Sequence, residues 1–217
     1  MFGSRARLLS PNTEEITAVI AAGGYATRLG CKYPKPFIEV DHIPLLRHWL
    51  FQINRIGITN ILVFTNRPEW YSATEAACDG FPARVETDKG FSCSLELAKL
   101  ALRYTDASKI LFLYGHAPRP SEIITSICDL GSLFSAGMTS TSSRREILSF
   151  GAGFLEPPFV IARSILQTAC ASTWGELAYE IPNQCKTIKI NGPCEFNQRE
   201  EMVAYLNYVR TWGQDFN

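Results

Sequence analysis

Residues 18–30 read Ala-Val-Ile-Ala-Ala-Gly-Gly-Tyr-Ala-Thr-Arg-Leu-Gly, and residues 34–36 read Pro-Lys-Pro. An apolar strand runs straight into a glycine turn, and the cations Arg28 and Lys35 follow closely. Glycines have no Cβ, so their backbone N–H groups can approach an anion closely. Two fixed cations can then neutralise a polyphosphate. The stretch therefore has the layout of a nucleoside triphosphate site.

The glycine spacing argues against the two commonest phosphate motifs. No Gly-Lys-Ser/Thr ends the turn, so a P-loop is excluded. The turn also lacks Gly-x-Gly-x-x-Gly, and no helix is expected directly after it, so the dinucleotide fingerprint of an NAD-dependent oxidoreductase is not met. A different class of nucleotide site is indicated.

The same residues resemble the signature of the nucleotidyltransferase family, which includes sugar-phosphate nucleotidyltransferases and molybdenum cofactor guanylyltransferase-like proteins. That signature is a hydrophobic strand, Ala-Ala-Gly-x-Gly-Thr/Ser-Arg-Leu and then Pro-Lys-Pro. Here the second glycine lies beside the first. The likeness continues in Val-Asp-His-Ile-Pro-Leu-Leu at 40–46 and in Gly-Ile-Thr-Asn-Ile-Leu-Val-Phe-Thr at 57–65. The alternative is a glycine-rich turn with two solvated cations.

Strand and helix signals alternate through the first half of the chain. Strands are predicted at 16–22, 60–65, 83–86 and 109–114, and helices at 45–56, 70–78 and 94–104. Repeated strand–helix–strand units predict an α/β fold with three layers, α/β/α, around a mostly parallel sheet. The resemblance implies that this Rossmann-like sheet is of the nucleotide-diphospho-sugar transferase type.

The second half of the chain has a less regular pattern. It predicts strands at 137–143, 149–154 and 187–190, and helices at 161–171, after Thr173 with Glu176 as a capping box, and at 198–211. No linker or repeat divides the chain. We therefore expect an N-terminal extension at 1–15 and a single nucleotidyltransferase-like domain at 16–217.

The composition is that of an ordinary globular protein, with 46% hydrophobic and 19% charged residues. Lys plus Arg and Asp plus Glu number 21 each, so no overall charge favours nucleic acid or an anionic membrane. No secretory signal or membrane-spanning run is evident. The seven cysteines include no Cys-x-x-Cys and suggest reduced thiols. We expect a cytoplasmic protein without nucleic-acid or membrane partners and leave a homo-oligomer open.

The expected chemistry is attack by an acceptor phosphate oxygen on the α-phosphorus of a nucleoside triphosphate, with release of pyrophosphate. The protein then has to align the reactants and offset negative charge. Arg28 would contact the β- and γ-phosphates, and Lys35 the α-phosphate and the attacking phosphate. The resemblance implies the same two catalytic roles. The residues expected to bind the nucleotide are Ala21, Ala22, Gly23, Gly24, Gly90 and Ser94.

The metal site departs from the family pattern. Relatives place an Asp after the third strong strand, in runs such as Leu-Tyr-Gly-Asp-x-Pro, whereas this chain has His116 there. Magnesium prefers oxygen ligands. Three interpretations of His116 stay open. His116 ligates a softer divalent metal, or it donates a hydrogen bond directly to a phosphate, or the metal site has been lost. A C-terminal run supplies Glu195 and Asn197 as the other expected ligands of Mg²⁺ or another divalent cation; Asn197 with Glu200 would alternatively cap the last helix.

Residues 150–158 resemble the family's stretch beneath the sugar, so the acceptor is expected to contact Ala152, Gly153 and Glu156. The resemblance then implies transfer of a nucleoside monophosphate from an NTP to a small phosphorylated acceptor, foremost a sugar 1-phosphate. Acceptors such as molybdopterin or polyol phosphates stay open because the chain is short. The alternative is a catalytically degenerate subunit that binds a nucleotide or nucleotide sugar and regulates a partner.

Overall fold

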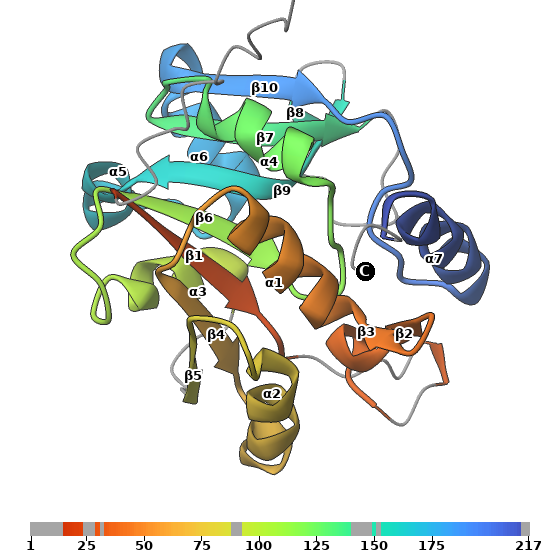
Figure 1. Cartoon of the computed structure of the whole chain (residues 1–217). Helices are drawn as coiled ribbons and strands as arrows, with labels where there is room; N and C mark the ends of the chain where they lie inside the picture. The colour runs from red at the N-terminus through yellow and green to blue at the C-terminus, as the bar shows by residue number, and fades with distance from the viewer. Residues whose placement is uncertain are drawn as a thin grey trace, which may run out of the picture.

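The computed structural model (Figure 1) describes residues 15–23, 29–30, 33–87, 93–139, 149–150 and 153–213. Within these residues, a central sheet of eight strands has the order β10-β7-β9-β6-β1-β4-β5, and β8 pairs with β9. The strands are β1 (Ile16–Ala21), β4 (Ile61–Thr65), β5 (Ala83–Thr87), β6 (Lys109–Tyr114), β7 (Phe134–Thr139), β8 (Ser149–Phe150), β9 (Gly153–Ala162) and β10 (Cys185–Lys189). A separate hairpin pairs β2 (Glu39–Val40) with β3 (Ile43–Pro44).

The sheet is mostly parallel, as the sequence predicts. β1 lies between β4 and β6 and is parallel to both, and β5 and β10 continue this direction beside β4 and β7. β9 runs antiparallel between β6 and β7. Crossover connections that contain helices make the parallel pairs possible. The carboxyl ends of β1, β4 and β6 consequently meet at one edge of the sheet.

Helices cover both faces of the sheet and complete the three layers (Figure 1). One face carries α1 (Leu45–Arg55), α2 (Tyr71–Cys78) and α4 (Ser121–Cys128), and the other carries α3 (Ser94–Ala101), α5 (Arg163–Thr168) and α6 (Trp174–Glu180). The last helix, α7 (Arg199–Trp212), packs near the β2–β3 hairpin. Short 3-10 turns are η3 (Lys35–Phe37), η4 (Pro68–Trp70) and η5 (Pro182–Gln184).

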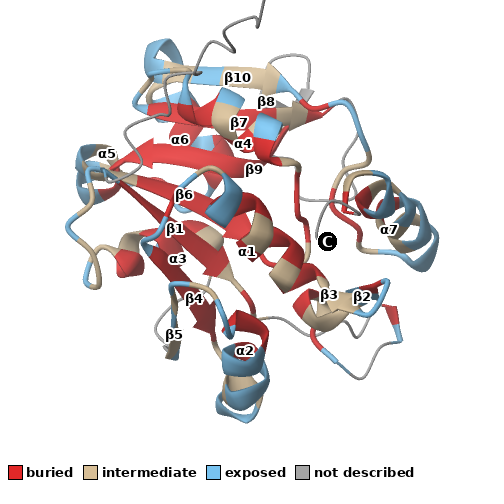
Figure 2. Ribbon diagram, viewed as in Figure 1, coloured by how far each residue is buried: buried red, intermediate tan, exposed pale blue. Residues whose placement is uncertain are grey.

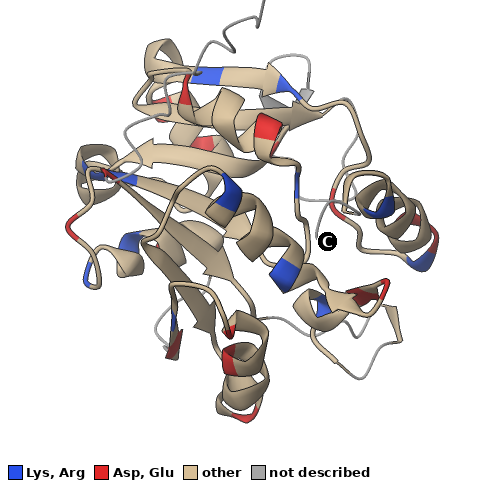
Figure 3. Cartoon of the chain, in the orientation of Figure 1, with Lys and Arg blue, Asp and Glu red and all other residues tan. Residues whose placement is uncertain are grey.

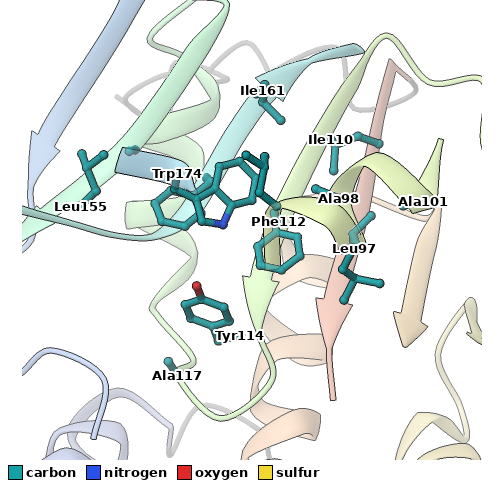
Figure 4. Close-up of a cluster of buried hydrophobic side chains, with 14 of the residues drawn as sticks. Leu97, Ala98, Ala101, Ile110, Phe112, Tyr114, Ala117, Leu155, Ile161 and Trp174 are labelled. Atoms are coloured by element: carbon teal, nitrogen blue, oxygen red, sulfur yellow. The ribbon is translucent and has the colours of Figure 1, made fainter. Parts of the chain in front are cut away.

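Two separate hydrophobic cores lie on the two faces because successive strand residues point in opposite directions. Val19 belongs to the core beneath α3 and α6, whereas Ile20 belongs to the core beneath α1, α2 and α4. The strands at the centre of the sheet are buried along almost their whole length (Figure 2). In the first core the indole of Trp174 lies 5.2 Å from the ring of Phe112 (Figure 4).

In the second half the sequence analysis shifted the start of two elements, missed one helix and assigned one capping box wrongly. The strand predicted at 137–143 is β7, which begins at Phe134, and the helix predicted from 161 begins at Arg163, because β9 continues to Ala162. A buried strand with apolar residues on both faces has no alternation that separates it from a helix. The sequence also failed to predict α4, in which three Ile and one Thr among eight residues favour a strand. Finally, Gln198 with Glu201, not Asn197 with Glu200, forms the capping box of α7.

Gly137 marks a register shift where β7 passes β9. A Cβ added there would lie 2.8 Å from the carbonyl oxygen of Glu156 and would overlap the side chain of Ile190. We expect Gly137→Ala to lower the free energy of unfolding by about 1–3 kcal/mol. Ile190→Val removes one of the overlapping atoms, so the loss should be smaller in that background. Urea denaturation of the double-mutant cycle measures this, and equal losses in both backgrounds would contradict the contact.

His48 of α1 is buried, with its ring 6.2 Å from that of Trp212 in α7. Burial lowers the pKa of His48 below its ordinary value of 6.5, although backbone groups of Val40 and Ile43 and the charge of Asp41 oppose the shift. The unfolded chain then binds the proton more readily. The contribution of buried, neutral His48 to the free energy of unfolding is therefore complete above about pH 6.5, and it is lost as the pH falls below this value.

We expect the difference in unfolding free energy between wild type and His48→Gln to shrink as the pH falls below about 6.5, by at most about 1.4 kcal/mol per pH unit. His42→Gln is the matched control because His42 lies exposed in the adjoining hairpin. Chemical denaturation at pH values on both sides of 6.5 measures the effect. A difference that stays constant with pH, or an equal dependence for both variants, would refute it.

Candidate active site

The site lies at the edge where the parallel strands end. Ala21, the last residue of β1, pairs with Phe64 of β4 and Tyr114 of β6. Two hydrogen bonds hold the segments just beyond the strands: Ala22 N donates to Phe64 O at 2.8 Å, and Gly115 N donates to Ala21 O at 2.9 Å. In open α/β sheets, ligands bind at such a carboxyl edge. The first residues of the predicted nucleotide turn, Ala21 and Ala22, and the segment that carries the predicted metal residue His116 therefore belong to the same edge.

Gly23 begins the predicted phosphate turn and packs against a residue that the sequence analysis missed. A Cβ at Gly23 would lie 2.5 Å from Oδ1 of Asn66, which follows β4. The Asn66 Oδ1 atom is buried and has no hydrogen-bond partner within the described part of the chain. A larger residue at this position would require the Asn66 side chain to move. Asn66 thus adds an amide oxygen beside the predicted turn, and its place after a buried strand was the available signal.

Lys35 lies in η3, between Pro34 and Pro36. Gly115 lets this turn approach β6, since a Cβ at Gly115 would lie 3.2 Å from Cγ of Pro36. From there the Lys35 ammonium donates to Asn197 Oδ1 at 2.8 Å and to the carbonyl oxygen of Phe196 at 2.5 Å. It also lies 5.2 Å from the centre of the Phe196 ring. Lys35 consequently joins the predicted nucleotide segment to the C-terminal site segment, residues 195–197.

His116 is directed at the same C-terminal segment. Its Nε2 lies 3.3 Å from Oε2 of Glu195, and the Glu195 side chain is only 1% exposed. The imidazole is held on two sides: it stacks on Tyr114 at 5.9 Å and meets the edge of Phe196 at 5.6 Å. The three residues expected to bind a metal, His116, Glu195 and Asn197, are therefore brought together, and each contacts a protein group.

Ser94 opens α3, but its hydroxyl contacts other protein side chains. Trp174 Nε1 donates to Ser94 Oγ at 2.9 Å, and Ser94 Oγ lies 3.0 Å from the hydroxyl of Tyr114. Figure 4 shows the Tyr114 hydroxyl turned toward Trp174. This polar link fixes Tyr114, on which His116 stacks. Ser94 therefore positions the Tyr114 ring beneath His116. Its expected contact with a nucleotide stays a prediction.

Arg119 is a second residue that the sequence analysis missed, although it is flanked by prolines as Lys35 is. Its guanidinium is fully buried, donates to Pro193 O at 2.7 Å and lies over the rings of Tyr205 and Tyr208 of α7, at 5.4 and 5.9 Å. Burial alone would lower the pKa of Arg119, but the two tyrosines and Glu156 raise it above its ordinary value. These contacts of Arg119 hold the C-terminal site segment and α7 against the loop that follows β6.

The remaining predicted site residues lie partly within and partly outside the described ranges of the chain. Ala21 and Ala22 lie at the site edge as predicted. Gly153 starts β9 and pairs with Phe150, whereas Glu156 is 2% exposed and acts on the buried Arg119. Contact of the acceptor with Gly153 and Glu156 stays a prediction. The residues outside the described ranges are Gly24, Arg28, Gly90 and Ala152.

The donor set does not fit a protein-bound magnesium ion. An imidazole stands where an aspartate is expected, Glu195 is paired with it, and Asn197 Oδ1 accepts from an ammonium group. Like unit charges about 4 Å apart repel by about 4 kcal/mol at an effective dielectric constant of 20, so the Lys35 ammonium opposes a divalent cation beside Asn197. No group of three or more His, Cys, Asp or Glu residues suited to a metal occurs within the described ranges.

Positions of Lys and Arg and positions of Asp and Glu are both spread along the described part of the chain (Figure 3). The whole sequence has 21 residues of each sign. None of the helices in the described part combines the length and the apolar character needed to span a bilayer.

The fold and this edge define an α/β protein of the nucleotidyltransferase class. Residues 18–172 match the family of the MobA-like NTP transferase domain, which is most of the chain. The chain belongs to this family. Membership confirms the resemblance seen in the glycine turn and the Pro-Lys-Pro run, and it places the chain with enzymes of the nucleotidyltransferase type.

The chain is also similar to curated relatives over a shorter stretch. Two 2-C-methyl-D-erythritol 4-phosphate cytidylyltransferases, from two strains of Leptospira borgpetersenii serovar Hardjo-bovis, are 36% identical to it over 69 residues. That stretch is 32% of this chain and 29% of each relative. The match therefore spans less than a third of the relatives' length.

Solved structures share the fold over nearly the whole chain. Rv0371c from Mycobacterium tuberculosis H37Rv is 18% identical with a TM-score of 0.65, covering 88% of this chain and 97% of that one. The 4-diphosphocytidyl-2C-methyl-D-erythritol synthase of Anaerococcus prevotii DSM 20548 is 13% identical with a TM-score of 0.68, covering 90% and 96%. These likenesses confirm the predicted fold class.

We expect Arg119→Met to lower the free energy of unfolding by about 3 kcal/mol, because it removes a buried hydrogen bond and leaves the Glu156 carboxyl without the charge that faces it. Arg84→Met is the matched control: Arg84 also lies over a tyrosine ring and pairs with Glu86, but its side chain is 55% exposed. The control should lose less than about 1 kcal/mol. Equal losses of unfolding free energy for the two variants in urea denaturation would show that Arg119 does not hold these segments together.

Proposed function

We propose that this chain transfers a nucleoside monophosphate from a nucleoside triphosphate to a small phosphorylated acceptor and releases pyrophosphate. The observation that carries the proposal is the position of Lys35. It projects from the Pro-Lys-Pro turn of a family member into the carboxyl edge of the sheet, where its ammonium reaches Phe196 and Asn197. Residues 16–217 would act as one nucleotidyltransferase-like domain.

In this reaction an oxygen of the acceptor phosphate forms a bond to the α-phosphorus, and the bond from that phosphorus to the bridging oxygen of pyrophosphate breaks. The main-chain N–H groups after β1 would hold the triphosphate, with Arg28 on the leaving phosphates. Lys35 would offset the charge that develops at the α-phosphate. The expected divalent cation finds no set of protein ligands among the described residues, so these steps are assigned to protein groups alone.

The acceptor we propose is a sugar 1-phosphate. A solved structure of similar fold is named a putative glucose-1-phosphate thymidylyltransferase, from Bacillus anthracis, and the two curated relatives are named for a polyol phosphate, 2-C-methyl-D-erythritol 4-phosphate. Ala152, Gly153 and Glu156 are the residues proposed to lie beneath it. The expected cytoplasmic location, the homo-oligomer, and the absence of nucleic-acid and membrane partners stay predictions.

A second candidate function is favoured by one contact. The His116–Glu195 pair stands where relatives are expected to bind their metal. A chain without that metal could bind a nucleotide or nucleotide sugar without turnover and regulate a partner. A pyrophosphate-release assay with the four ribonucleoside triphosphates and a panel of sugar and polyol phosphates separates the two functions, because tight binding without turnover supports only the second.

We expect Lys35→Met to lower the rate of pyrophosphate release by about 10²–10³-fold, the usual cost of losing one group that stabilises transition-state charge. Lys186→Met is the control, since Lys186 lies in β10 at the far side of the sheet and donates to Leu130 O. Initial rates at saturating substrate measure the effect, and circular dichroism checks the fold. A folded Lys35→Met protein with wild-type rates would refute the assignment.

A further inference from the structure

The two oxygen ligands expected for a metal already have protein groups as partners. Glu195 Oε2 faces His116 Nε2 at 3.3 Å, and Asn197 Oδ1 accepts from Lys35 Nζ at 2.8 Å. The Lys35 ammonium also bonds the intervening carbonyl of Phe196. A cation bound to these oxygens would lie directly beside an imidazole and an ammonium group.

The partners are held firmly in these positions. His116 is stacked on Tyr114, whose ring is in turn fixed by its hydroxyl contact to Ser94. Phe196 is fully buried and lies between the imidazole and the Lys35 ammonium, with its ring in contact with both. Rotation of His116 away from Glu195 would break this packing. The arrangement is therefore a built feature of the site.

The Lys35 ammonium makes this edge less suited to a cation. The two carboxylates nearby already have partners: Glu195 faces the His116 imidazole, and Glu201 accepts the N–H groups of Asn197 and Gln198. A pair of carboxylates, which a magnesium site needs to offset its charge, is absent from residues 114–118 and 193–198. Phosphate groups are hydrogen-bond acceptors only, so donors and an ammonium suit them directly.

We propose that Lys35 and the His116–Glu195 pair take the place of a protein-bound divalent cation, so that the site binds nucleotide phosphates in the absence of magnesium or manganese. This inference rests on the proposed function, because it concerns the same nucleotide site. It differs from that function in stating which groups neutralise the phosphates.

Calorimetric titration of the whole chain with ATP, GTP, CTP and UTP tests the inference, each in excess EDTA and in excess MgCl₂. The dissociation constant of the preferred nucleotide should differ by less than about twofold between the two conditions. His116→Asp restores a carboxylate, so magnesium should tighten its binding by about tenfold or more. His116→Asn is the matched control: it has the same size without the charge, and magnesium should leave its affinity unchanged.

Titration with Mn²⁺ alone, followed by electron paramagnetic resonance, gives a second readout without nucleotide. Wild type and His116→Asn should leave the signal of free Mn²⁺ intact, and His116→Asp should reduce it. Nucleotide binding by wild type in magnesium but not in EDTA, or Mn²⁺ binding by wild type, would overturn the inference and leave the proposed function standing. Binding of no nucleotide in either condition would overturn both.

Discussion

The Lys35 ammonium connects parts of the chain that lie 161 and 162 residues apart. One end of this contact is the proline-flanked turn after β1, and the other is the segment that leads into α7. The position of each depends on the sheet between them, because Pro36 packs closely against Gly115 at the end of β6. The register of β1 and β6 thus decides where the ammonium group lies. The remaining contacts of the edge, from His116 to Arg119, follow from that placement.

The fold of the first half was predictable from the sequence because its signals are local. The apolar runs at 16–22, 60–65 and 109–114 end at turns, and α1 shows helical spacing that closes at Gly57. The second half was harder because β9 is buried on both faces and carries no alternation. Its direction, antiparallel between β6 and β7, is set by pairing with distant strands and leaves no local mark in the sequence.

The position of the candidate site in the fold was predictable to the extent that a motif fixes backbone position. Gly23, Lys35 and His116 lie at the predicted edge, and the C-terminal segment with Glu195 and Asn197 meets them there. Their side-chain partners were not predictable, since each contact joins residues far apart in sequence. Arg119 shows this limit: a cation between two prolines suggests a rigid loop, but only the fold shows that two tyrosines of α7 enclose it.

The family match ends at residue 172, just before Trp174 opens α6. The indole of Trp174 lies 4.5 Å from the ring of Phe159 and 5.2 Å from that of Phe112, so α6 covers apolar rings in the middle of the sheet. During synthesis on the ribosome, these rings and the guanidinium of Arg119 stay uncovered until α6 and α7 have been made. The edge that carries the candidate site is therefore completed only after the residues of α7 that enclose Arg119 have been translated.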